Sequence, residues 1–140
     1  MRILSSAIDA NADLRAVQLK WFEEELVKTR AANAKHIFVL TYHPWFVNDT
    51  DKADAYHNIP KIARQEYLDL MRRFEVDYTL AGHLNAEASE RYECISMITT
   101  AALSKLLGRD PECLQVVKVY PDRVEHAYYA LDKVPESVKM

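Results

Sequence analysis

Two histidines stand directly after apolar runs that are typical of buried strands. His43 follows the run from Ile37 to Leu40, and His83 follows the run from Val76 to Leu80. A helical segment separates the two runs, so the order strand, loop, helix, strand predicts two parallel strands in one sheet. Because ligands bind at the carboxyl ends of such strands, we expect the two imidazoles to lie together there, where they could share one metal ion.

The composition limits the function classes that need to be considered. The chain has 140 residues, of which 49% are hydrophobic and 28% charged, and its formal net charge is −3. These values predict a single domain and give no electrostatic reason to expect nucleic acid or an anionic membrane as a partner. No apolar run reaches membrane-spanning length, and the first residues make a poor signal peptide. We therefore expect a cytoplasmic protein.

Glycine and cysteine are both informative because they are scarce. The two glycines, Gly82 and Gly108, are too few for a Walker-type or dinucleotide-binding loop, so both of these phosphate-binding motifs are excluded. Cys94 and Cys113 are the two cysteines. In a reducing compartment we expect them to be free thiols rather than a disulfide or zinc ligands.

The first half of the chain must position His43. An amphipathic helix is predicted from about residue 13 to residue 33, followed by a strand over 35–40. We expect this helix to bury one broad apolar stripe, made of Leu14, Val17, Trp21, Phe22 and Leu26.

A long irregular segment follows His43, from Tyr42 to Asn58. Loops of this length in a compact domain tend to be functional or mobile. Trp45 and Phe46 have two interpretations that the sequence leaves open: they wall a substrate pocket beside His43, or they seal the core. The aspartates of this loop lack the glycine and closing glutamate of a calcium loop, so we expect a solvated surface there.

The second helix is predicted over residues 60–74, with Ile62, Ala63, Tyr67, Leu70 and Phe74 facing inward. A second central strand over 76–80 leads to His83. The last third is rich in β-structure, with strands expected over 93–100, 114–120 and 124–131. The last two are joined as a hairpin through residues 121–123. The fold class is therefore α/β, with a mixed sheet and a β-rich C-terminal third.

Ordered stretches of the sequence resemble the C-terminal half of a calcineurin-like metallophosphoesterase. The stretches that carry this resemblance are 18–26, 35–44 and 76–83, and those that are similar to one branch of the family are 108–111, 114–119 and 124–129. Their order and spacing are more specific than any single motif. The resemblance covers about residues 18–131, and it implies that residues 1–140 form one domain that is the C-terminal portion of a phosphoesterase domain.

The resemblance implies a partial β-sandwich with αββα layers and a site for divalent metal ions (Mn, Fe or Zn) that hydrolyses a phosphate ester. His43 and His83 match two histidines that hold one metal in the family. Asn85 stands where the family has a histidine for the other metal, and its amide oxygen is a weak ligand for iron or zinc. Arg109 has two interpretations, a contact to the substrate phosphate or a plain turn with an internal salt bridge.

Three motifs of the family's first half are absent from the sequence: Asp-x-His, Gly-Asp and Gly-Asn-His. Without their carboxylates, His43 and His83 provide fewer protein ligands than a catalytic zinc needs. We therefore expect the chain to be weakly active or inactive alone, and an open sheet to be covered by a second copy or by a partner chain. The alternative is a non-catalytic interaction module derived from the phosphoesterase fold.

Overall fold

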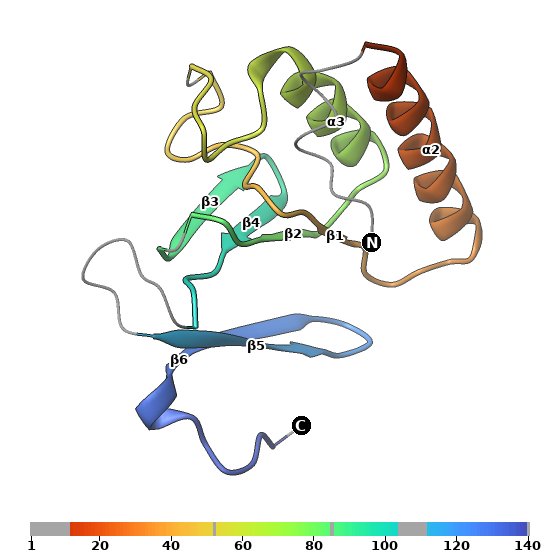
Figure 1. Ribbon diagram of the computed structural model, residues 1–140. Coiled ribbons are helices and arrows are strands. Elements are labelled where there is room, and N and C mark those ends of the chain that lie inside the picture. Colours follow the sequence, from red (N-terminus) through yellow and green to blue (C-terminus); the bar gives the residue numbers. More distant parts are fainter. Residues whose placement is uncertain (1–11, 52, 85, 104–111, 140) are drawn as a thin grey trace.

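The computed structural model describes residues 12–51, 53–84, 86–103 and 112–139, and its architecture is mixed α/β (Figure 1). Within these ranges the helices are α2 (Ala12–Ala31), α3 (Lys61–Arg73) and the short 3-10 helix η1 (Leu131–Lys133). The strands are β1 (Phe38–Leu40), β2 (Tyr78–Ala81), β3 (Ala88–Tyr92), β4 (Ile95–Thr99), β5 (Cys113–Val119) and β6 (Val124–Ala130).

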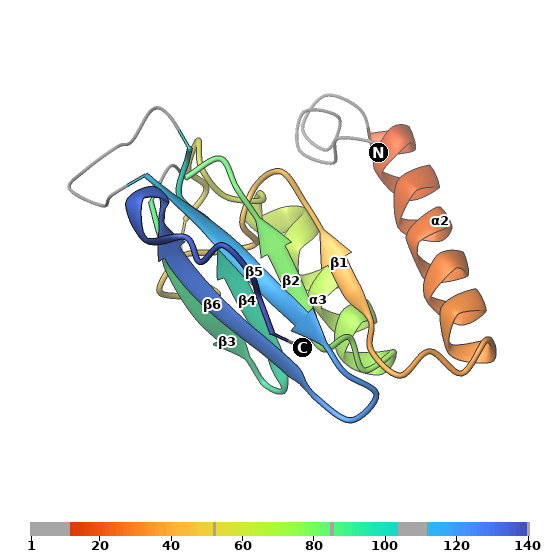
Figure 2. The same ribbon diagram turned by 90° about the horizontal axis from the view of Figure 1, so that it is seen from below.

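The strands form two sheets that lie in separate layers. The first sheet has the order β1-β2-β4-β3, with β1, β2 and β4 parallel and β3 antiparallel to β4. The second sheet is the antiparallel hairpin β5-β6. In Figures 1 and 2, α3 lies on one face of the first sheet and the hairpin lies on the other. The predicted α/β class, mixed sheet and β-rich C-terminal third are confirmed.

The predicted first helix is confirmed as α2, but only part of its predicted apolar stripe is buried. Phe22 and Leu26 are buried, at 7% and 3% exposure. Leu14, Val17 and Trp21 are 52%, 62% and 47% exposed, so the prediction that they are buried is wrong. These residues are exposed because α2 lies beyond the β1 edge of the first sheet, where the described strands do not extend under that side of the helix (Figure 2).

Helix α3 buries two adjacent rows of residues against the first sheet. These residues are Ala63, Arg64, Tyr67, Leu68, Leu70 and Met71. Ile62 is 71% exposed, so its predicted inward position is wrong. It lies just after Pro60, the residue that caps the helix, and the buried rows begin one residue later.

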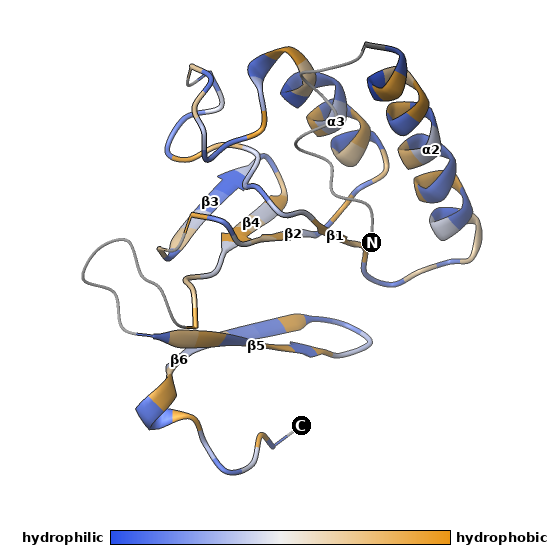
Figure 3. Ribbon diagram, in the orientation of Figure 1, coloured by the Kyte–Doolittle hydropathy of each residue, from blue (hydrophilic) through white to orange (hydrophobic). Residues whose placement is uncertain are grey.

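Strand β3 is an element that the sequence prediction missed. Its residues Ser89, Glu90 and Arg91 are polar, and Figure 3 shows the strand as a hydrophilic segment at the sheet edge. A polar edge strand has no apolar periodicity to detect, because neither of its faces is fully buried. The predicted strand over 93–100 corresponds to β4, whose Ile95, Met97 and Ile98 are buried.

The predicted hairpin over the C-terminal third is confirmed as β5-β6, and hydrogen bonds join it to other parts of the described chain. The Nε2 atom of His36 lies 2.8 Å from the Tyr120 carbonyl oxygen, and the Tyr128 hydroxyl accepts a 3.0 Å hydrogen bond from the Ala101 N–H. His126 lies in β6, with its ring 6.3 Å from that of Tyr78.

The main hydrophobic core lies between the helices and the first sheet. Its buried members are Phe22, Leu26, Ile37, Val39, Trp45, Phe46, Ile59, Ala63, Tyr67, Leu68, Leu70, Met71, Val76, Ile95 and Met97. Cys94 is exposed, Cys113 is buried, and the two do not form a disulfide. None of the helices in the described ranges is long and apolar enough to span a bilayer.

Candidate metal centre

The parallel pairing of β1 and β2 brings the two predicted histidines together. Leu40 and Leu80 are register partners, and the pairing continues beyond the strands. The Thr41 N–H donates to the Leu80 carbonyl at 3.0 Å, and the Gly82 N–H donates to the Tyr42 carbonyl at 3.2 Å. The loops that carry His43 and His83 therefore leave the same edge of the sheet side by side.

The rings of His43 and His83 are in direct contact. Their centroids are 3.9 Å apart and their planes are inclined by 55°. Two tyrosines flank His83: the ring centroid of Tyr42 is 4.8 Å from it, and that of Tyr56 is 4.9 Å from it. Tyr42 is half exposed and Tyr56 is 87% exposed, so this cluster opens to solvent on the tyrosine side.

The backbone at His83 is unusual. Its φ is 63°, in the left-handed region that residues other than glycine rarely adopt. Such conformations cluster at functional sites, where the surrounding structure stabilises them. On the other side of the pair, the Thr41 hydroxyl donates to the His43 carbonyl at 2.8 Å, which fixes the turn after β1. A hydrogen bond to the His43 backbone and the left-handed conformation of His83 thus shape the two loops that carry the imidazoles.

The surroundings of His43 favour its neutral ring. Burial lowers the pKa of His43, and the neighbouring His83 and His57 lower this pKa further. His43 Nδ1 and His83 Nε2 are buried and have no hydrogen-bond partner among the described residues. Neutral imidazole is the form that binds metals, so these orphaned nitrogens fit a metal ion. Within the described ranges, no group of three or more His, Cys, Asp or Glu side chains could hold one.

Of the other predicted site residues, the structure describes Trp45. Asn85 and Arg109 lie outside the described residues. Trp45 is 1% exposed, and its ring packs 5.4 Å from that of Tyr67 in the core. Of the two interpretations of Trp45, the structure favours the core seal; a contact with substrate stays a prediction.

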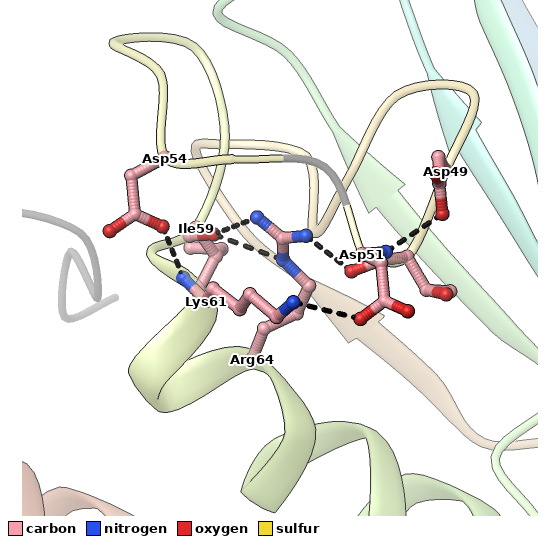
Figure 4. A network of polar contacts seen from close by, with 7 residues as sticks. Asp49, Asp51, Asp54, Ile59, Lys61 and Arg64 are labelled. Atoms are coloured by element: carbon pink, nitrogen blue, oxygen red, sulfur yellow. Dashed lines mark hydrogen bonds and ion pairs between the residues drawn. The ribbon is translucent and has the colours of Figure 1, made fainter.

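A buried arginine organises the loop that carries Tyr56. Figure 4 shows Arg64 reaching from α3 into this loop. Its Nε and Nη2 atoms donate to the Ile59 carbonyl at 3.2 and 2.9 Å, and its Nη1 atom donates to the Thr50 carbonyl at 2.5 Å. The pKa of Arg64 is lowered, because the effect of burial exceeds the opposite effect of nearby aspartates, of which Asp54 contributes most.

The loop aspartates form hydrogen bonds and an ion pair with neighbouring residues of the same loop and of α3. Asp54 accepts from the Lys61 N–H at 2.6 Å, Asp49 accepts from the Asp51 N–H at 2.8 Å, and Lys61 pairs with Asp51 at 3.0 Å (Figure 4). All three carboxylates are on exposed residues, in agreement with a solvated loop. The sequence analysis missed Tyr56 and Arg64, because an irregular loop and an arginine on a helix carry no periodic signal.

Comparisons with known proteins support the resemblance stated from the sequence. No family model matches the chain. Proteins named serine/threonine-protein phosphatase CPPED1 match it: the Homo sapiens protein is 32% identical over 124 residues and the Rattus norvegicus protein 30% identical over 121 residues. The Danio rerio protein is 26% identical over 116 residues.

These matches cover 88%, 86% and 83% of this chain, respectively. They cover only 40%, 39% and 38% of the relatives, so the chain spans about two fifths of their length. The chain thus matches part of a calcineurin-like phosphoesterase of the CPPED1 type.

Proposed function

We propose that this chain is the C-terminal portion of a metal-dependent phosphoesterase domain, with its two sheets forming part of an αββα sandwich. The observation that carries the proposal is the contact between His43 and His83, whose ring centroids are 3.9 Å apart at the ends of two parallel strands. Their buried, unpartnered nitrogens are suited to hold one divalent metal ion.

Asn85 is proposed as a further ligand, because it stands two residues after His83 in the sequence. Two imidazoles suit zinc or iron, whereas an amide oxygen suits a harder ion such as manganese. When bound, such an ion supplies Lewis-acid polarisation of a phosphoryl oxygen. Arg109 is proposed to contact the phosphate through its guanidinium, which matches phosphate geometry.

The substrate class that we propose is a phosphate ester, in keeping with the phosphatase name of the relatives. We also propose that the chain alone hydrolyses such esters weakly or not at all. His43, His83 and Asn85 include no carboxylate, and a catalytic centre with two metals needs anionic ligands to bridge and neutralise the ions. The missing ligands would come from the part of the domain that this chain does not contain.

A non-catalytic interaction module is the second candidate function. It is supported by the exposed apolar residues of α2. The two candidates differ in metal content: the first requires an ion bound by His43 and His83, and the second requires none.

The test is metal content by mass spectrometry, measured on protein purified without chelator, with p-nitrophenyl phosphate hydrolysis in added manganese measured in parallel. We expect bound metal that is lost in His43→Ala and in His83→Ala, with slow or undetectable hydrolysis. The matched control is His126→Ala, because His126 is an exposed histidine of β6 and belongs to no proposed site.

The possible results separate the proposals. Metal retained by both site variants would refute the metal centre, and no metal in any variant would favour the interaction module. Fast hydrolysis that disappears in the site variants would support the centre but refute the predicted weak activity.

A further inference from the structure

Two tyrosine rings lie at the open side of the histidine pair. The structure describes all eight tyrosines of the sequence, and the exposed ones are Tyr42 and Tyr56, at 50% and 87%. Both rings contact His83, with centroids 4.8 and 4.9 Å from it, and the Tyr42 ring lies 4.9 Å from that of His43. The exposed tyrosines of this chain are thus gathered beside the candidate metal centre.

The backbone that carries each of these rings is fixed by hydrogen bonds. The Tyr42 carbonyl accepts the 3.2 Å hydrogen bond from the Gly82 N–H. Tyr56 lies in a turn closed by Asn58, which is only 4% exposed. The Asn58 side-chain oxygen accepts from the Ala55 N–H at 3.0 Å, and the Asn58 N–H donates to the Ala55 carbonyl at 3.2 Å. The backbone on both sides of Tyr56 is therefore held, although its ring is exposed.

Exposed aromatic rings on a fixed backbone are suited to bind a ligand. Each ring leaves a flat apolar face in water, and a planar group that stacks on this face removes it from water. Little conformational entropy is lost on binding, because tyrosine has few rotatable side-chain bonds and the backbone is already ordered. Tyr42 and Tyr56, here named the tyrosine pair, thus offer a stacking surface next to the imidazoles of His43 and His83.

We propose that the tyrosine pair binds the aromatic ring of an aryl phosphate, a phosphate ester of a phenol, whose phosphate lies at His43 and His83. In such an ester the ring is bonded directly to the ester oxygen, so the ring and the phosphate are immediate neighbours. The tyrosine pair and His83 are neighbours in the same way. This inference rests on the proposed function and narrows its substrate class from phosphate esters in general to esters with an aromatic leaving group.

Two other groups that tyrosine rings recognise fit the arrangement less well. A quaternary ammonium group is bound by several rings that enclose it, whereas Tyr56 is 87% exposed and encloses little. The base of a nucleotide also stacks on aromatic side chains, but a ribose separates this base from the phosphate. The tyrosine rings, in contrast, directly contact His83. Both groups are therefore included as probes in the experiment.

The experiment is a nuclear magnetic resonance titration of the chain in the presence of equimolar zinc. The probes are four phosphate esters: phenyl phosphate, cyclohexyl phosphate, phosphocholine and AMP. The amide shift of His83 reports binding and does not depend on turnover. We expect phenyl phosphate to bind about fivefold more tightly than cyclohexyl phosphate, because a planar aromatic ring stacks on tyrosine and a puckered ring of similar size does not.

Variants of Tyr56 test whether its ring causes this preference. Tyr56→Ala should weaken the binding of phenyl phosphate about fivefold and keep that of cyclohexyl phosphate within about twofold of the parent value. Tyr56→Phe keeps the ring and should restore the preference. The matched control is Trp21→Ala, because Trp21 is an aromatic residue of α2 that is 47% exposed and belongs to neither pair. We expect Trp21→Ala to leave the preference unchanged, and circular dichroism establishes that each variant is folded.

The possible results distinguish this inference from the proposed function. Equal affinity for phenyl and cyclohexyl phosphate would overturn the inference and leave the metal centre standing. A preference for phenyl phosphate that persists in Tyr56→Ala would also overturn it. Tighter binding of phosphocholine or of AMP than of phenyl phosphate would assign the tyrosine pair to a cationic group or to a nucleobase instead. If none of the four esters binds, the proposed function is refuted together with this inference.

Discussion

Replacing Arg64 with methionine tests whether one buried guanidinium holds the loop in front of the candidate metal centre. Arg64 is 1% exposed and donates three hydrogen bonds to the carbonyls of Ile59 and Thr50. Methionine keeps most of the aliphatic length but has no donor. The carbonyls of Ile59 and Thr50 would then lose the hydrogen bonds that this guanidinium donates.

The expected cost follows from these contacts. Hydrogen bonds that involve a charged group contribute about 1.5–3 kcal/mol each, and a carbonyl left unpaired costs about 1–3 kcal/mol. Because two of the three bonds share the Ile59 oxygen, we expect a total loss of about 3–5 kcal/mol in the free energy of unfolding. This is a large fraction of the about 5–15 kcal/mol that is typical of a domain.

The assay is urea unfolding followed by circular dichroism, with the m-value checked for each variant. The free energy of unfolding of Arg64→Lys should lie between those of the parent chain and Arg64→Met. The lysine ammonium can donate to one carbonyl but cannot reproduce the several donors of the guanidinium. The control is Arg72→Met on the same helix. Its side chain is 50% exposed, in ion pairs of 4.0 and 3.8 Å, so we expect a loss of less than about 1 kcal/mol.

The reasoning is refuted if Arg64→Met destabilises no more than Arg72→Met. A second readout follows the loop itself, since proteolysis of the segment around Tyr56 should accelerate in Arg64→Met at urea concentrations where the helices are intact. Unchanged cleavage together with a large loss of stability would show that Arg64 stabilises the core but does not hold the loop.

Two further predictions concern the core. Burial raises the pKa of Tyr67 from 10.0 to about 12, so stability that is fully present below pH 10 should fall by up to about 3 kcal/mol as the pH rises to 12. The difference between the parent chain and Tyr67→Phe, measured by urea unfolding at pH 9 and at pH 11.5, isolates this effect; a constant difference would contradict it. Leu26→Ala should cost about 2–5 kcal/mol because Leu26 is 3% exposed, whereas Leu14→Ala, at a 52% exposed position, should cost less than about 1 kcal/mol. Equal losses in thermal unfolding would refute the assignment of the two helix faces.

The part of the site that was predictable depended on strand ends. An apolar run followed by a histidine is visible in the sequence, and two such runs around a helix place His43 and His83 on one edge. Tyr56 was not predictable in the same way. It reaches His83 through a loop whose path is set by Arg64, and neither residue is part of a periodic pattern.

The fold was predictable where one face of an element is buried. Phe22 and Leu26 lie on the core side of α2 as expected, and the β5-β6 hairpin follows from its alternating residues. Periodicity could not reveal that Trp21 is exposed, because an apolar residue has the same appearance whether its partner element is in this chain or elsewhere. Strand β3 was missed because its residues are polar and neither of its faces is fully buried, so the sequence has no apolar alternation there.

The way in which the β5-β6 hairpin is joined to the first sheet has a consequence for how the molecule opens. Cys113 of the hairpin is buried, but no hairpin residue is a member of the main core cluster, and the junction with the first sheet includes the His36–Tyr120 and Ala101–Tyr128 hydrogen bonds. Breaking such a junction exposes much less apolar surface than unfolding the helices and the first sheet. We therefore expect the amides of the hairpin to exchange hydrogen faster than those of the layer that carries His43 and His83.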